Sequence, residues 1–232
     1  PTRRSSDLTF FVGLIALGSI VLSNFSANED EIPSIAILYM KNLGNTEDEP
    51  WAYGLTEDLI VEMSRMGNIR VASMNAVTKF KGSDLSESDI AKELDVVFTL
   101  TSSIHKSNEQ FNLRCQLHDH KKNMTLFGNK WTESLENASL IVGNLADSLS
   151  NKLTYKKSDH QLVSETYKAD PVAYEYMLKG KYKIQHQQSS EDWETAESLL
   201  KMSTDIDIDL APSWALLGWI SFSQGKFQEM HE

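Results

Sequence analysis

The residues best suited to chemistry in this chain are three carboxylates in the stretch WAYGLTEDLIVEMSRM (51–66). Glu57, Asp58 and Glu62 fall close together on a predicted helix, and clustered carboxylates can bind a metal ion or act as an acid/base pair. No histidine lies near them in the sequence. Apolar residues recur along the same stretch at helical spacing, which predicts a core-facing helix. We therefore interpret the acidic cluster as the solvated face of a packing helix.

Two histidines form a second candidate. His118 and His120 alternate along a predicted strand, so both project from one face and could chelate a metal together. Asp119 lies between them and points to the other face. We therefore predict no metal and no cofactor. A metal-binding enzyme domain that combines these histidines with Glu57 and Asp58 is the less favoured alternative.

The single cysteine is predicted to be an inert, buried thiol. In FNLRCQL (111–117), Cys115 shares the apolar face of an alternating strand, and the polar face carries Asn112, Arg114 and Gln116. One cysteine also excludes an internal disulfide bond and a cysteine-based zinc site. Since no nucleophile elbow, P-loop or dinucleotide fingerprint is present either, we predict no catalytic residue.

Composition limits the classes of partner. The chain has 232 residues, of which 41% are hydrophobic and 24% charged, enough for one domain of ordinary size and a smaller one. Its net charge of −11 argues against nucleic acid and against an anionic membrane surface as partners of the soluble part. The short basic stretches 79–82 and 120–123 are interpreted as solubilising tips.

The elements that position these residues alternate in type. Strands are predicted at 34–42, 69–74, 96–104, 111–117 and 125–134, and helices at 51–66, 86–94 and 137–153. This order favours an α/β (α+β) domain over 34–153, in which helices pack on a mixed sheet.

The N-terminal region predicts a membrane anchor. Residues 8–25 are uncharged and about 27 Å long as a helix, which is close to the minimum for a transmembrane helix. A cleaved signal peptide is the alternative. Residues 1–7 match a translated sequencing adaptor and are treated as an artefact, so their arginines say nothing about topology. We expect a short linker at 26–33 and a fragment that is incomplete at both ends.

The stretches GLTEDLI (54–60) and FKG (80–82), with SIAILYMKN before them, resemble the TolB amino-terminal-like (FlgO-like) domain over residues 33–153. The family motif falls on Gly54, Leu55, Thr56, Glu57, Asp58, Leu59, Phe80 and Gly82. The chain departs from the family at Tyr39, where a proline is usual, and at His118–Asp119. The resemblance implies a non-catalytic α/β module outside the cytoplasm. It also implies one preceding transmembrane helix and tetratricopeptide repeats that follow.

The C-terminal region is consistent with such repeats. Trp214, Leu217 and Gly218 have the W-x2-L-G spacing of a tetratricopeptide repeat. Gly180, Ala196 and Leu200 occupy matching positions in a preceding repeat. We predict about one and a half repeats over 171–232, after a linker at 154–170, with a concave surface for a protein or peptide.

The functional hypothesis is a sensory or protein-interaction region of a bacterial signalling protein. By resemblance, its output domain is a class III adenylate or guanylate cyclase that lies outside this chain. A serine/threonine kinase, a winged-helix regulator or an envelope assembly factor without output are the alternatives. The expected location is the inner membrane, with a single pass through the N-terminal helix and the soluble region in the periplasm. Homodimerisation is left open.

Overall fold

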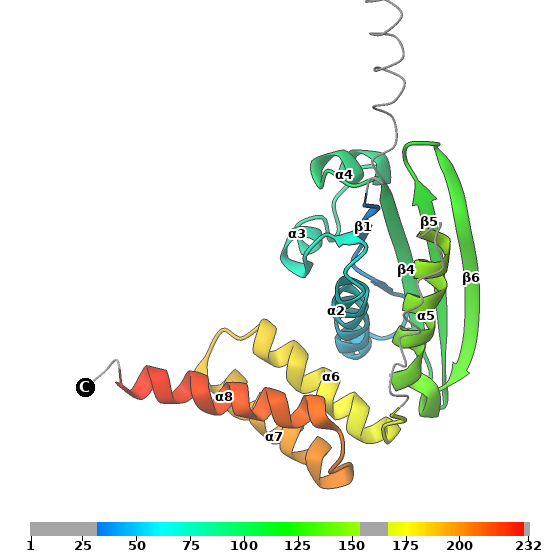
Figure 1. Cartoon of the computed structure of the whole chain (residues 1–232). Coiled ribbons are helices and arrows are strands. Elements are labelled where there is room, and N and C mark those ends of the chain that lie inside the picture. The colour runs from blue at the N-terminus through cyan, green and yellow to red at the C-terminus, as the bar shows by residue number, and fades with distance from the viewer. Residues whose placement is uncertain (1–31, 154–166, 230–232) are drawn as a thin grey trace, which may run out of the picture. The chain divides into compact units, whose positions relative to one another are not determined.

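A mixed β-sheet organises the structure, a computed structural model that describes residues 32–153 and 167–229 (Figure 1). The strands are β1 (Ser34–Ile37), β2 (Lys41–Asn42), β3 (Arg70–Val71), β4 (Phe98–Lys106), β5 (Gln110–Asp119) and β6 (Met124–Ser134). Their order is β3-β1-β4-β5-β6, and β2 pairs with β4. Strand β1 runs parallel to β3 and β4, whereas β4, β5 and β6 form an antiparallel meander. This confirms the predicted mixed α/β domain.

One face of the sheet is covered by two helices. The helices of this part of the chain are α2 (Glu49–Arg65), α3 (Met74–Thr78), α4 (Glu87–Glu93) and α5 (Ala138–Leu153), with short 3-10 turns η1 (Thr46–Asp48) and η2 (Leu135–Asn137). Leu55 and Leu59 of α2 meet Leu113 of β5 and Leu145 of α5 in the core. The alternation in β5 predicted this face, because every second residue from Phe111 is buried.

Helix caps explain where the sequence prediction held and where it failed. Ser86 accepts a hydrogen bond from the Asp89 backbone N–H and begins α4, as predicted. Ser73 does the same for the Ala76 N–H and begins α3. The predicted strand 69–74 is therefore wrong beyond residue 71, because the serine starts a helix there.

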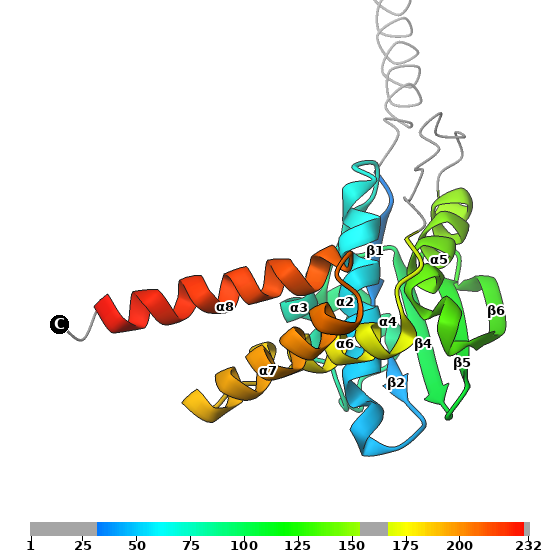
Figure 2. The same cartoon turned by 90° about the horizontal axis from the view of Figure 1, so that it is seen from below.

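Three further helices complete the described chain. They are α6 (Pro171–Gln185), α7 (Ser190–Ile206) and α8 (Ala211–Glu229). Helix α6 packs against α2 and α7, and α8 follows beside α7 (Figure 2). The described residues from 33 to 229 belong to one compact unit. A Cβ atom added at Gly54 of α2 would overlap the buried side chain of Leu178 in α6, so the two helices meet without an intervening side chain.

The predicted tetratricopeptide segment is wrong. In that repeat, the Trp and Leu side chains fill the groove between paired helices, and the Gly position allows the helices to pack closely. Here the Trp214 side chain is 50% exposed, and a Cβ atom at Gly218 would meet nothing within 4 Å. Gly180, Ala196 and Leu200 do pack together between α6 and α7, but this close contact belongs to a helix pair that is docked on α2.

The membrane part of the predicted fold class is not found among the described residues either. The helix expected at 8–25 and the artefact expected at 1–7 lie outside the described residues. Within 32–153 and 167–229, no helix combines the length and the apolar content that crossing a bilayer requires. The fold class is thus corrected to a mixed α/β domain with additional packed helices.

The two glycines of the supposed repeats provide a test of this packing. A Cβ atom at Gly180 would lie 2.7 Å from Leu200 Cγ and 3.3 Å from the Ala196 carbonyl oxygen. We expect Gly180→Ala to lower the free energy of unfolding by about 1–2 kcal/mol, because crowding outweighs the gain in helix propensity. Gly218→Ala is the matched control and should raise it by about 0.5–1 kcal/mol. Urea unfolding measures both, and a destabilising Gly218→Ala would restore the repeat model.

Candidate functional site

A groove of about 1070 Å³ lies on the sheet face opposite α2 and α5. Its floor is formed by polar side chains of β4 and β5 that alternate with the buried ones, namely Thr101, Ser103, Arg114 and Gln116. Its wall comes from α3, the turn after it and α4, through Val77, Phe80, Lys81, Gly82 and Ile90. The groove therefore lies between the meander and the crossover from β3 to β4.

Basic residues form a row across the groove. Lys41 of β2 is the register partner of Ser103 of β4. Ser103 is in turn the partner of Arg114 of β5, and Arg114 is the partner of Lys130 of β6. Register partners project from the same face of a sheet, so the three cations face the groove together. Lys41, Arg114 and Lys130 are all exposed.

Two glycines shape the groove. Gly128 of β6 is the register partner of Gln116, and its missing side chain leaves the floor open at that level. Gly82 follows α3 with a φ of +73°, a left-handed conformation that glycine adopts without strain. The family motif residues Phe80 and Gly82 thus belong to the wall of the groove.

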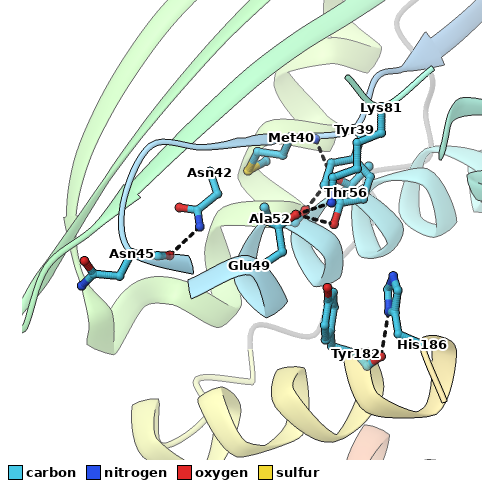
Figure 3. A network of polar contacts seen from close by, with 10 residues as sticks. All are labelled: Tyr39, Met40, Asn42, Asn45, Glu49, Ala52, Thr56, Lys81, Tyr182 and His186. Atoms are coloured by element: carbon cyan, nitrogen blue, oxygen red, sulfur yellow. Dashed lines mark hydrogen bonds and ion pairs between the residues drawn. The ribbon is translucent and has the colours of Figure 1, made fainter. Parts of the chain in front are cut away.

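Tyr39 ties the wall to α2 (Figure 3). Its hydroxyl donates a hydrogen bond of 2.9 Å to Glu49 Oε1, and the Lys81 ammonium lies 2.5 Å from the same oxygen. The Lys81 Nζ atom also stands 4.0 Å from the centre of the Tyr39 ring, a cation–π contact. Burial and the Glu49 carboxylate both raise the pKa of Tyr39, so the phenol stays protonated. Tyr39 therefore has a structural role in holding this segment against α2.

Thr56 holds the adjacent segment in place. Its hydroxyl donates to the Ala52 carbonyl oxygen at 2.6 Å and accepts from the Met40 N–H at 3.0 Å (Figure 3). The segment between β1 and β2 is thereby anchored to α2. The neighbouring motif residues Leu55 and Leu59 are 2% and 1% exposed, so they serve the core.

The acidic cluster was predicted to face water, but the structure gives it a charged partner. Lys181 of α6 reaches back to α2 and places its ammonium 2.8 Å from Glu57 Oε2 and 2.5 Å from Asp58 Oδ1. Burial raises the pKa of Asp58, whereas the two carboxylates raise the pKa of Lys181 despite its burial. Glu62 pairs with Arg65 on the outside of the helix. The prediction failed because the partner lies more than 100 residues away along the chain.

The two histidines lie together but lack further ligands. Their ring centres are 4.7 Å apart, and His120 Nε2 is 2.9 Å from the Thr99 hydroxyl. Burial, with a smaller effect of His118, lowers the pKa of His120. In the described part of the chain, no three His, Cys, Asp or Glu residues are grouped in a way that could hold a metal ion.

Cys115 is a buried thiol, as predicted. It is 2% exposed, and burial raises its pKa to about 12. The thiolate is therefore not accessible near neutral pH, which argues against a nucleophilic role.

Sequence reasoning found the polar face of β5 but missed the basic row and Lys181. Arg114 was placed on the correct face from its alternation with Cys115. Lys41 and Lys130 could join it only through the register of four strands, for which the sequence carries no local signal.

Comparisons with known proteins give a weak but broad match. No family model matches the chain. A protein of Rhizobium meliloti (strain 1021) named "Putative adenylate cyclase 3" is 24% identical over 194 residues, which cover 82% of this chain and 33% of that protein. The chain thus spans about a third of the length of the curated relative that it matches.

Two solved structures are similar in part. TolB from Acinetobacter baumannii is 17% identical, with a TM-score of 0.41. The match covers 56% of this chain and 30% of TolB. The lipoprotein GNA1162 from Neisseria meningitidis is 13% identical, with a TM-score of 0.39. The match covers 51% of this chain and 96% of the lipoprotein. TolB, whose amino-terminal domain the sequence resembles, is therefore among the structural neighbours.

The contact between Lys181 and Asp58 gives a pH-dependent prediction. In Lys181→Met, Asp58 keeps its burial but loses the ammonium, so its pKa rises further. A carboxyl group whose pKa is higher in the folded chain than in the unfolded chain favours folding at acid pH, and this contribution is lost as the pH rises through the folded pKa. We expect a loss of about 2 kcal/mol in unfolding free energy at about pH 7, and a smaller loss at about pH 4.

Urea unfolding at the two pH values measures this effect. Lys201→Met is the matched control, because Lys201 is 62% exposed and, among the described residues, forms an ion pair only with Glu197 on the surface of α7. Its effect should stay below about 0.5 kcal/mol at both pH values. A loss in Lys181→Met that does not depend on pH would contradict the assigned role of Asp58.

Proposed function

We propose that this chain is a non-catalytic, extracytoplasmic interaction region of a bacterial signalling protein whose output domain is of the adenylate cyclase type. The alignment to a protein named as an adenylate cyclase supports this, because it extends over 82% of the chain and leaves two thirds of that protein outside the match. The same alignment favours a cyclase over a kinase or a winged-helix domain as the output. The resemblance to the TolB amino-terminal-like domain supports a location outside the cytoplasm.

The exposed aromatic surface of α8 carries the proposal of protein binding. Trp214 and Trp219 are 50% and 54% exposed. Large aromatic side chains left open to water on one helix mark interaction surfaces, where tryptophan is enriched among the residues that dominate binding.

The polar residues of the described chain support a non-catalytic role. Glu57 and Asp58 are matched by Lys181, and Glu49 is matched by Lys81 and Tyr39. The cysteine is protonated and covered. Catalytic groups need pKa values near the working pH and access to a substrate, and these residues have structural partners instead.

The complete gene offers the direct test of the output. Expression of the whole protein in a bacterial host should produce cyclic AMP, and residues 33–232 alone should produce none. Deletion of residues 33–232 should retain the chemistry but change its rate, since the catalytic residues lie elsewhere. Cyclic AMP formed by residues 33–232 alone would contradict the non-catalytic role, and an unchanged rate after the deletion would contradict a signalling role.

Site-specific photo-crosslinking tests the interaction surface. A photoreactive amino acid in place of Trp219 should give a discrete protein adduct in cells, because this side chain lies on the proposed interface. The same amino acid at Ser198, an exposed position of α7, is the matched control and should give none. Equal adduct patterns at both positions would remove α8 as the binding surface.

A further inference from the structure

We infer that the groove on the open face of the sheet binds a small organic molecule with two or more negative charges, carried by phosphate or carboxylate groups. The charges would lie along Lys41, Arg114 and Lys130, and the organic part against Tyr39 and Phe80. This site is separate from the aromatic surface of α8, so the inference goes beyond the proposed protein interaction.

The charge of the groove is opposite to that of the chain. The chain has a net charge of −11, whereas the charged residues that line the groove are Lys41, Glu49, Lys81, Arg114 and Lys130. Glu49 is already matched by Lys81. Among the described residues, Lys41, Arg114 and Lys130 have no carboxylate within ion-pair distance. Three uncompensated cations thus face one hollow of an acidic protein.

The position of Arg114 and Lys130 indicates that an anion belongs between them. They are direct register partners on β5 and β6, and like charges in that arrangement destabilise a sheet. Lysines are common on edge strands such as β6, but Arg114 lies on the interior strand β5. A bound anion would convert this repulsion into two attractive contacts.

The geometry fits more than one anionic group. Neighbouring strands lie about 4.8 Å apart, so the row from Lys41 through Ser103 and Arg114 to Lys130 extends over roughly 14 Å. The arginine can present two parallel N–H donors to one phosphate or carboxylate, and each lysine adds a point charge. The hydroxyl groups of Thr101 and Ser103 line the same floor and can donate to the ligand.

The size and the wall of the groove indicate an organic ligand. Its volume of about 1070 Å³ is far larger than an inorganic anion needs and lies slightly above the range of ligand pockets, roughly 300–1,000 Å³. Apolar side chains of Leu38, Val77, Phe80 and Ile90 line the hollow beside the cations. A ligand that combines charged groups with an apolar portion would contact both surfaces.

Calorimetric titration of the purified chain at low ionic strength tests the inference. The probes are tripolyphosphate for the phosphate arm and citrate for the carboxylate arm. Orthophosphate, which carries a single anionic group, is the reference. We expect tripolyphosphate or citrate to bind with one molecule per chain and more tightly than orthophosphate, and the arm that binds identifies the chemistry. Arg114→Gln and Lys130→Gln should each weaken binding about tenfold or more, since each removes a charge-assisted contact.

Two controls separate binding from folding. Lys152→Gln changes an exposed lysine of α5, outside the groove, and should leave the affinity unchanged. In the absence of ligand, Arg114→Gln should raise the melting temperature, because it removes the repulsion by Lys130. A variant that is more stable and yet binds less cannot be explained by misfolding.

Two results would overturn the inference. These are no binding of either multiply charged probe, or equal losses of affinity in Lys152→Gln and Arg114→Gln. Failure here is distinct from failure of the proposed function. Crosslinking from position 219 should persist in Arg114→Gln, and Trp219→Ala should bind the probe like the unmodified chain.

Discussion

The structure depends on the burial of α2 from two sides at once. Trp51 shows this directly, because its ring is 1% exposed and lies 6.4 Å from Phe111 of the sheet and 5.8 Å from Tyr174 of α6. One turn further along, Gly54 lets the side chain of Leu178 approach the helix backbone. Burial of large aromatic and aliphatic surfaces is the dominant favourable term in folding, so the sheet and the C-terminal helices are stabilised together.

This arrangement leaves a groove on the other face of the sheet. With α2 and α5 on the apolar side, the polar side of β4 and β5 becomes the floor of a groove, and α3 with its glycine turn becomes the wall. The contacts of Thr56 with Met40 and of Tyr39 with Glu49 fix the segment that carries Lys41. The burial of α2 and the shape of the groove are therefore linked, and a ligand in the groove would stabilise the same unit that presents α8.

The sequence predicted those features that depend on local patterns. The strict alternation around Cys115 gave the correct buried face of β5, and Ser86 gave the correct start of α4. Features that depend on distant partners could not be predicted. Lys181 meets Asp58 only because α6 returns to α2, and the basic row forms only through strand register.

The failed repeat prediction has the same cause. The spacing of Trp214, Leu217 and Gly218 is a local signal, but the side chain of Trp214 packs in the expected groove only if a partner helix covers it. Its indole N–H instead donates to the Ile208 carbonyl oxygen, and half of the side chain is exposed. The spacing of these residues predicted helix α8 correctly, but it predicted the wrong packing of that helix against its neighbours.

Site-resolved unfolding tests most directly whether the sheet and the C-terminal helices form one unit. The five tryptophans can be labelled as fluorotryptophan and followed by fluorine NMR through a urea titration; Trp51 and Trp131 report on α2 and β6, and Trp193 and Trp219 on α7 and α8. The account predicts one midpoint for all of these signals. Loss of the Trp193 and Trp219 signals at lower urea, with Trp51 and Trp131 still native, would contradict it.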